Sequence, residues 1–320
     1  MNKNAKRSVR PVAILSVWAV VAIALSTCAT LKRSTVPEIV TANGNSSASV
    51  TSARGQVSSL KVMTLNIAHG RSTGFHQLLQ SRSTAVRNLD QIREVLHREM
   101  PDLLALQEAD GPSFWSGNFN HVNYLADKEF FYQYVRGKHA DRMNLSYGTA
   151  LLSNLELENP LAITFAPAVA SAPKGFVVAT IDWPGQGFTE VDVVSVHLAA
   201  LRKSLRKEQA TELARIIAER GKPTIIMGDL NAGWNGGTSA LHLLMEALNL
   251  KTYRPYDENL VTFPKFNERL DWILVSHEFD FVSHKVLPDT VSDHLGVVAE
   301  LALTPARVNV AKGTSPGSSR

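Results

Sequence analysis

The stretch Pro223-Thr224-Ile225-Ile226-Met227-Gly228-Asp229-Leu230-Asn231 decides how the rest of the chain is interpreted. Its first half is apolar and β-branched, which predicts a buried strand. Its second half places a carboxylate and an amide, Asp229 and Asn231, at the end of that strand. Charged groups beside a long apolar run must be paired or bind an ion, because burying an unpaired charge is costly. The stretch therefore predicts a buried strand that delivers polar side chains to a functional site.

Similar strand-like runs recur on both sides of this stretch. The predicted strands cover 60–66, 102–108, 147–153, 176–181, 191–197, 223–229, 270–275 and 295–301. Apolar residues at helical spacing predict two helices, over 83–99 and 202–220. Many strands with few helices between them favour two packed sheets with helices outside, an α/β (α+β) arrangement. We interpret residues 59–305 as one domain.

Polar residues at the ends of these strands form one chemical set. They are Asn66, Glu108, His197, Asp229, Asn231, Asp271, Asp293 and His294. Carboxylate and amide oxygens with a few imidazoles suit a hard cation, Mg²⁺, Mn²⁺ or Ca²⁺, better than zinc. The single cysteine, Cys28, excludes an intramolecular disulfide and a cysteine zinc cluster. The set predicts a divalent-cation site that takes substrate phosphate.

Seven motifs, in order, resemble the endonuclease/exonuclease/phosphatase superfamily, which includes deoxyribonuclease I, AP endonucleases, neutral sphingomyelinases and inositol polyphosphate 5-phosphatases. The motifs are Met63-Thr64-Leu65-Asn66, Leu106-Gln107-Glu108, Gly148-Thr149-Ala150-Leu151-Leu152-Ser153, Ser195-Val196-His197-Leu198, Gly228-Asp229-Leu230-Asn231-Ala232, Arg269-Leu270-Asp271-Trp272-Ile273 and Ser292-Asp293-His294. The resemblance implies a four-layered, deoxyribonuclease I-like sandwich of two central sheets flanked by helices. It also implies a metal-dependent phosphoesterase site at one edge.

The resemblance further implies a role for each residue. Glu108 is expected to bind the cation with Asn66 beside it, and Asp293 to assist the metal or its water shell. Asp229 is expected to orient or deprotonate the attacking water, and Asn231 to hold that water or a phosphate oxygen. His294, oriented by Asp271, would contact the scissile phosphate. His197 would donate to a non-bridging oxygen or assist the leaving group. Four other histidines, His69, His76, His121 and His139, match no motif and are expected on the surface or in loops, with His69 near the site.

The N-terminal part predicts export. Residues 1–10 are basic, and residues 11–29 are almost wholly apolar, which indicates a signal peptide or a membrane anchor. Leu25-Ser26-Thr27-Cys28 resembles a bacterial lipoprotein box, so lipidation of Cys28 is an alternative. Residues 30–58 are expected to be a flexible linker and 306–320 a disordered tail. We therefore expect a periplasmic or cell-envelope location. A cytoplasmic enzyme with a misassigned start codon is the alternative.

Charge distribution bears on the substrate. The first 60 residues hold seven of the 33 basic and one of the 29 acidic residues, which leaves 26 basic and 28 acidic residues for the remainder. The nearly neutral domain argues against tight non-specific DNA binding. The loop 110–119 carries Phe114, Trp115 and Phe119 and is a candidate to cover substrate or touch lipid. The basic run 202–207 is interpreted as a solvated helix face within reach of an anionic substrate.

Three functional hypotheses follow. The first is an exported or membrane-tethered phosphodiesterase that cleaves a phospholipid or a small phosphoester. The second is a secreted endonuclease acting on DNA or RNA. The third is a non-catalytic module that binds phosphate ligands on the same fold. The complete set of polar residues favours an enzyme, and the sequence makes no prediction of oligomeric state.

Overall fold

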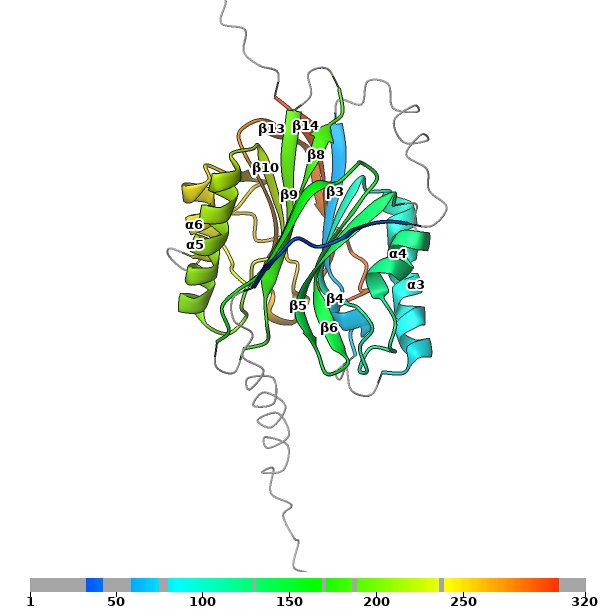
Figure 1. Ribbon diagram of the computed structural model, residues 1–320. Coiled ribbons are helices and arrows are strands. Elements are labelled where there is room, and N and C mark those ends of the chain that lie inside the picture. The colour runs from blue at the N-terminus through cyan, green and yellow to red at the C-terminus, as the bar shows by residue number, and fades with distance from the viewer. Residues whose placement is uncertain are drawn as a thin grey trace, which may run out of the picture.

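The computed structural model describes residues 33–42, 59–74, 80–128, 131–168, 171–185, 189–235 and 239–304. Two seven-stranded sheets pack face to face (Figure 1). In order across the first sheet, the strands are β1 (Arg33–Thr35), β7 (Glu158–Thr164), β8 (Gly175–Trp183), β9 (Thr189–His197), β10 (Thr224–Asp229), β12 (Asp271–Val275) and β11 (Lys251–Thr252). Across the second, they are β13 (Phe279–Val286), β14 (Val297–Leu303), β3 (Ser59–Asn66), β4 (Leu103–Asp110), β6 (Leu145–Ser153), β5 (Gln133–Arg142) and β2 (Ile39–Thr41).

Helices cover the outer face of each sheet. Figure 1 shows α3 (Arg82–Glu99) and α4 (His121–Lys128) on one side of the molecule, and α5 (Lys203–Arg220) and α6 (Ala240–Ala247) on the other. Two 3-10 turns, η1 (Ala68–Gly70) and η3 (Pro264–Phe266), follow β3 and precede β12. The expected four-layered sandwich is confirmed.

Three apolar cores hold these layers together. One lies between the two sheets and contains Leu60, Val193 and Ile225. A second packs sheet residues such as Leu104 against α3 and α4, and a third packs the other sheet against α5 and α6. Both faces of each central strand are thus buried, which explains why those strands are continuously apolar in the sequence.

The sheet pairing brings the polar strand ends to one edge. Strands β3 and β4 are parallel neighbours, and so are β9 and β10. Their carboxyl ends therefore lie together, and Asp229 pairs in register with His197 on one side and Asp271 on the other. Gly228 has a φ of 148°, and a Cβ there would lie 2.0 Å from the carbonyl oxygen of Val196. Glycine is required here because β9 and β10 approach closely just before Asp229.

All eight predicted strands and both predicted helices are present, with ends shifted by a few residues. Ser81 caps α3 by accepting a hydrogen bond from the amide of Thr84. The elements that the sequence did not reveal are β1, β2, β5, β7, β11 and β13 and the helices α4 and α6. Strand β13 is at a sheet edge and largely exposed, so its apolar signal is weak.

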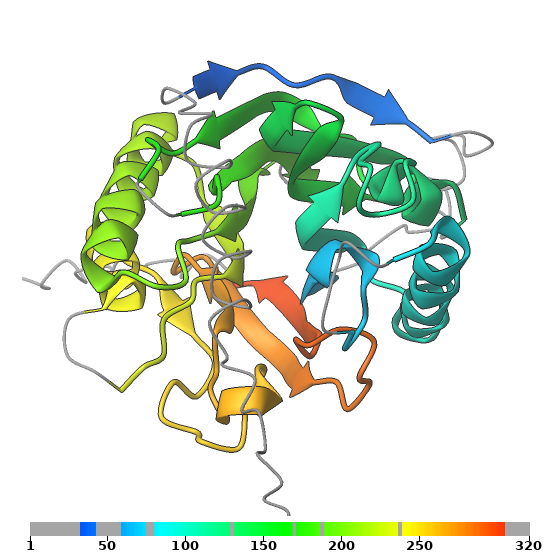
Figure 2. The same ribbon diagram turned by 90° about the horizontal axis from the view of Figure 1, so that it is seen from below.

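The segment expected to be a linker contains two strands, which corrects that prediction. Strand β1 pairs with β7 in one sheet and β2 pairs with β5 in the other, so residues 33–41 bridge the edges of both sheets. Figure 2 shows these strands, drawn in blue, running across one side of the molecule. Both are only three residues long, too short for a hydrophobic period to appear in the sequence. The Arg33 guanidinium also donates to the carbonyl of Lys138.

The N-terminal and C-terminal predictions, for residues 1–29 and 306–320, lie outside the described residues. No helix in the described part of the chain has both the length and the apolar character needed to cross a bilayer.

Candidate active site

A cavity of about 830 Å³ opens at the edge where the polar strand ends meet. Seven of the eight predicted site residues line it, and Asp271 lies fully buried behind His294. The seven are Asn66, Glu108, His197, Asp229, Asn231, Asp293 and His294. The structure thus gathers residues that the sequence spreads over more than 200 positions.

Asp229 is the centre of the hydrogen-bond network. Its Oδ2 accepts from Asn66 Nδ2 at 3.1 Å and lies 3.3 Å from His197 Nε2, while its Oδ1 accepts from the amide of Asn231 at 2.9 Å. Burial alone would raise the pKa of Asp229, but the imidazoles of His294 and His197 outweigh it and lower the pKa to about 2. Asp229 is therefore an ionised, buried carboxylate.

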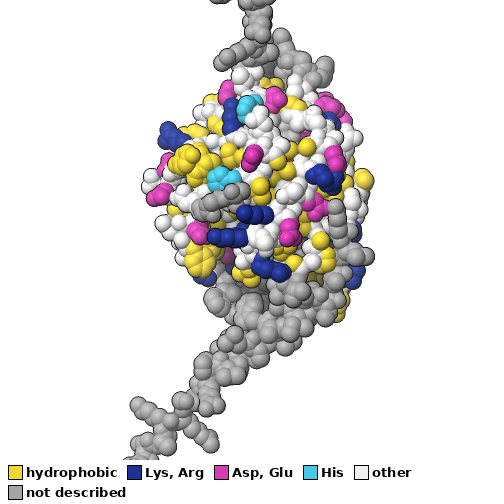
Figure 3. Space-filling view, turned by 90° about the vertical axis from the view of Figure 1, so that its left-hand side faces the viewer, with side chains coloured by type: hydrophobic (Ala, Val, Ile, Leu, Met, Phe, Trp, Pro, Cys, Tyr) yellow, Lys and Arg dark blue, Asp and Glu magenta, His cyan; other side chains and the backbone are white. Residues whose placement is uncertain are grey.

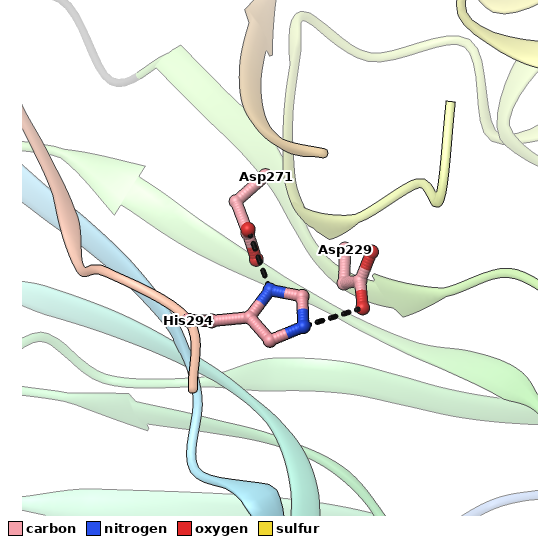
Figure 4. Close-up of side chains that lie close together, drawn as sticks. All are labelled: Asp229, Asp271 and His294. Carbon is pink, nitrogen blue, oxygen red and sulfur yellow. Dashed lines mark hydrogen bonds and ion pairs between the residues drawn. The ribbon is translucent and has the colours of Figure 1, made fainter. Parts of the chain in front are cut away.

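His294 lies between two carboxylates (Figure 4). Its Nδ1 is 2.8 Å from Asp271 Oδ2, and its Nε2 is 3.8 Å from Asp229 Oδ2. Burial opposes the charged imidazole, but these two carboxylates raise the pKa of His294 to about 10. The ring of Phe263 packs against the imidazole with centroids 4.6 Å apart. Thr262 Oγ1 accepts from the backbone amide of Asp271 and so fixes the start of β12.

Glu108 reaches the cavity from an irregular point in β4. The pairing of β4 with β6 shifts register between Leu106 and Ala109, and Glu108 has a φ of 50°. Its two carboxylate oxygens lie 3.4 Å from Lys174 Nζ and 3.3 Å from His69 Nε2. Burial would raise the pKa of Glu108, but the positive charges of His69 and Lys174 hold it well below its ordinary value. The cavity therefore contains a second ionised carboxylate.

His69 lies beside the site in the turn η1, as expected, but it is buried rather than on the surface. Its Nδ1 lies 2.6 Å from Asp110 Oδ1, and Trp115 Nε1 donates to Asp110 Oδ2 at 2.8 Å. Burial opposes the charged ring, but Asp110 and Glu108 raise the pKa of His69. The sequence signal was its place three residues after Asn66.

The sequence also missed two cations in the cavity. Lys174 Nζ lies 2.8 Å from His197 Nε2, and burial together with this ammonium lowers the pKa of His197. Arg71 Nη2 donates to Asp293 Oδ2 at 2.6 Å, so Asp293 is paired with a cation at the cavity wall. Neither cation follows an apolar run, which is why strand-end reasoning did not find them.

Two of the remaining unmatched histidines, His139 and His121, also differ from expectation. His139 is buried and links the two sheets through Thr149 of β6 and Thr164 of β7. His121 is buried at the start of α4, where its Nε2 lies 3.0 Å from the carbonyl of Ser116. His76 lies outside the described residues.

Two parts of the site offer ligands for a cation. Ligand atoms of Asp229, Asp271 and His294 lie within 4.8 Å of one another, close enough to hold one metal ion. The carboxylate of Glu108 and the amide of Asn66 face the same cavity and supply oxygen, the donor that hard cations prefer. Asp271 Oδ1 is buried without a hydrogen-bond partner among the described residues.

The family model for the endonuclease/exonuclease/phosphatase family matches residues 63–294, the segment that carries the whole site. The chain belongs to this family. No curated protein sequence matches this family member.

Solved structures share the family fold. An endonuclease/exonuclease/phosphatase from Beutenbergia cavernae is 23% identical with a TM-score of 0.59, over 77% of this chain and 72% of that one. The human Nocturnin catalytic domain with bound sulfate is 19% identical with a TM-score of 0.56, over 84% and 98%. A mannosyl-6-phosphatase from Bacteroides thetaiotaomicron is 19% identical with a TM-score of 0.53, over 76% and 100%. At these identities the likeness shows the fold.

Proposed function

We propose that this family member is a divalent-metal-dependent phosphodiesterase, a hydrolase that is exported or tethered to the cell envelope. The observation that carries the proposal is the placement of ionised Asp229 between two imidazoles of unlike charge. His294 is an imidazolium, with its pKa raised to about 10, while the pKa of His197 is lowered. Carboxylate and imidazolium groups placed in this way match the base and acid that phosphoester hydrolysis needs.

Each residue then has a chemical task. Asp229 accepts a proton from the water that attacks phosphorus, and Asn66 and the Asn231 amide keep its carboxylate oriented. The His294 imidazolium, held by Asp271, binds a phosphate oxygen and neutralises the charge that grows in the transition state. It then gives its proton to the alcohol oxygen as the bond between that oxygen and phosphorus breaks. His197 and Lys174, which lie side by side, donate to another phosphate oxygen.

The site fits a hard divalent cation. Glu108 is ionised, faces the cavity and supplies oxygen, and Asn66 lies on the adjacent strand. Glu108 and Asn66 would hold Mg²⁺, or Mn²⁺ or Ca²⁺, because both line the cavity with oxygen atoms that hard cations prefer. Such a cation supplies Lewis-acid stabilisation of phosphate charge. Asp293, already paired with Arg71, would act on the water shell.

The charge of the domain and its N-terminal segment bear on the substrate class. A phospholipid or small phosphodiester fits the nearly neutral domain better than long nucleic acid, which requires many Lys and Arg contacts. Export rests on the basic residues 1–10 and the apolar run 11–29. DNA or RNA as substrate, and phosphate binding without turnover, are the outcomes that the following experiment would distinguish.

The test is hydrolysis by the full chain with Mg²⁺, Mn²⁺, Ca²⁺ or EDTA. Bis-p-nitrophenyl phosphate, plasmid DNA, RNA, sphingomyelin and an inositol phosphate would be offered in parallel. We expect EDTA to abolish turnover, and Asp229→Asn and His294→Gln each to lower it at least about 100-fold. Matched controls are Asp182→Asn and His277→Gln, both exposed and absent from the cavity lining. Equal turnover by the site variants and the controls would refute the assignment.

A further inference from the structure

The chain enters the folded domain at its catalytic edge. Arg33 of β1 pairs with Thr164, Thr164 with Gly175, and Gly175 with His197. Adjacent strands lie about 4.8 Å apart, so the Arg33 backbone is roughly 14 Å from that of His197. Strand β1 then runs away from this edge, since Thr35 pairs with Ala162. Whatever precedes Arg33 therefore joins the domain beside the opening of the cavity.

The apolar run ends close to this entry point. Residues 11–29 form the run, and only residues 30–32 separate it from Arg33. Four peptide spacings reach at most about 14 Å. The opposite end of the sheets lies farther away, because the eight residues of β4 alone extend roughly 26 Å. A bilayer that holds residues 11–29 must therefore be near the catalytic edge.

Exposed apolar side chains gather at the same edge. Among the described residues, eight large hydrophobic side chains are strongly exposed, and five of them lie on loops that extend from the catalytic ends of strands. The five, here called the apolar rim, are Phe114 (60% exposed), Met143 (84%), Leu201 (89%), Tyr256 (76%) and Phe266 (65%). Single exposed apolar residues are ordinary, but a group around one opening indicates an interaction surface.

The apolar rim lies on both sides of the cavity. Leu201, Tyr256 and Phe266 line the opening itself. Phe114 follows β4, which carries Glu108, and Met143 is at the turn between β5 and β6. Leu201, Tyr256 and Phe266 therefore belong to loops of one sheet, and Phe114 and Met143 to loops of the other.

Basic residues stand next to this rim. Helix α5 begins at the catalytic edge, and Lys203 and Lys207 in its first turns are exposed at the opening. Figure 3 shows Lys and Arg side chains close together on the lower half of the face seen there. The acidic Asp257, Glu258 and Glu268 also line the opening, and the exposed Lys265 stands beside Phe266 in η3. Apolar side chains beside lysines suit the surface of an anionic bilayer.

We propose that the catalytic edge docks on the bilayer that holds residues 11–29, with the apolar rim inserted between headgroups. The substrate is then the phosphodiester of a lipid in that same membrane, presented to the cavity without leaving the bilayer. This inference rests on the proposed function and deepens it by specifying that the substrate is a lipid within the membrane.

The test measures which end of the domain touches lipid. The full chain is reconstituted in phosphatidylethanolamine–phosphatidylglycerol vesicles after labelling Leu201→Cys or, as matched control, Met100→Cys with a polarity-sensitive fluorophore. Met100 is also an exposed apolar residue, but it precedes β4 at the far end of the sheet. The chain without either substitution, labelled in the same way, gives the background signal from Cys28, the sole native cysteine. We expect lipids with nitroxide-labelled tails to quench the label at position 201 at least about threefold more than at position 100.

Equal quenching at both positions, or a chain that does not float with the vesicles, would overturn the proposed docking. The same samples are assayed with Mg²⁺ on bis-p-nitrophenyl phosphate and on vesicle lipid. Turnover of the soluble ester without selective quenching would refute docking while the phosphodiesterase stands. Selective quenching with turnover of the soluble ester alone would support docking and refute the lipid substrate, whereas turnover of neither ester would refute the proposed phosphodiesterase.

Discussion

The side-chain amide of Asn66 donates to Asp229 Oδ2 across 3.1 Å and thereby joins two sheets at the catalytic edge. Asn66 ends β3 and Asp229 ends β10, strands that belong to different sheets. Asn66 Oδ1 also accepts from the amide of Ala68 at 3.0 Å, which fixes the orientation of the Asn66 side chain. The position of the proposed base therefore depends on the packing of the sheets as well as on its own strand.

Replacing Asn66 by Asp tests this relationship. A second carboxylate beside Asp229 would raise the pKa of Asp229 and remove a donor, so we expect kcat to fall about 100-fold. The exposed residue Asn249 at the end of α6 provides a matched Asn→Asp control. Kinetics on a soluble phosphodiester provide the measurement, and similar kcat values for the two variants would contradict the role of Asn66.

Replacing Asp271 by Asn tests the source of the charge on His294. Its two carboxylate neighbours raise the pKa of His294 to about 10, so removing one charge lowers that pKa. The His294 imidazolium then loses its proton at a lower pH than in the wild type. We expect the alkaline limb of the kcat/KM profile to move down by at least about one pH unit. An NMR titration of the His294 ring gives an independent measurement, and an unmoved limb and ring pKa would contradict the pairing.

Thr262 is predicted to position Asp271. Its buried Oγ1 accepts from the backbone amides of both Leu270 and Asp271, at 2.9 and 3.0 Å. Thr262→Val leaves these buried donors unpaired, at a cost of about 1–3 kcal/mol in the free energy of unfolding. Thr262→Ser keeps the oxygen and is the control. Denaturant titration and kcat should separate the two variants; a serine variant as impaired as the valine variant would indicate that packing matters instead.

The lowered pKa of buried His139 predicts that the folded protein loses stability in acid. Burial lowers its pKa to about 3, whereas the unfolded residue titrates near 6.5. As the pH falls below 6.5 the unfolded state binds the proton first, so the folded state loses stability down to pH 3. At pH 5 this amounts to about 2 kcal/mol relative to pH 7. Unfolding of wild type and His139→Asn at both pH values measures it; the variant should show a smaller difference, and an unchanged one would contradict the assignment.

The bridging strands β1 and β2 are predicted to stabilise the domain. Deleting residues 1–42 removes both strands and the half-buried Ile39 and Val40, whereas deleting 1–32 leaves them in place. We expect the longer deletion to lower the unfolding free energy by about 2 kcal/mol or more and Tm by about 5 °C relative to the shorter one. Matching Tm values would support the original interpretation of this segment as a linker.

Local patterns in the sequence revealed the central strands and the residues at their ends. A strand buried on both faces must be apolar throughout, so runs such as 223–229 and 191–197 stand out without knowledge of their partners. The polar residues that end them are equally visible, and parallel pairing sends their ends to one edge. The four layers followed from these signals and from the family motifs, and so did eight site residues, seven of which line the cavity.

Tertiary structure alone decided which side chains meet. Asn66 and Asp229 are 163 residues apart, and Lys174 reaches His197 and Glu108 only because β8, β9 and β4 are packed together. His69 and His139 look like loop or surface residues in the sequence, because their partners, Asp110 and two threonines, lie on other strands. Strands β1 and β2 gain their hydrogen bonds from sheet edges formed more than 90 residues later in the chain. Contacts between distant segments leave no local period in a sequence, and only the folded chain displays them.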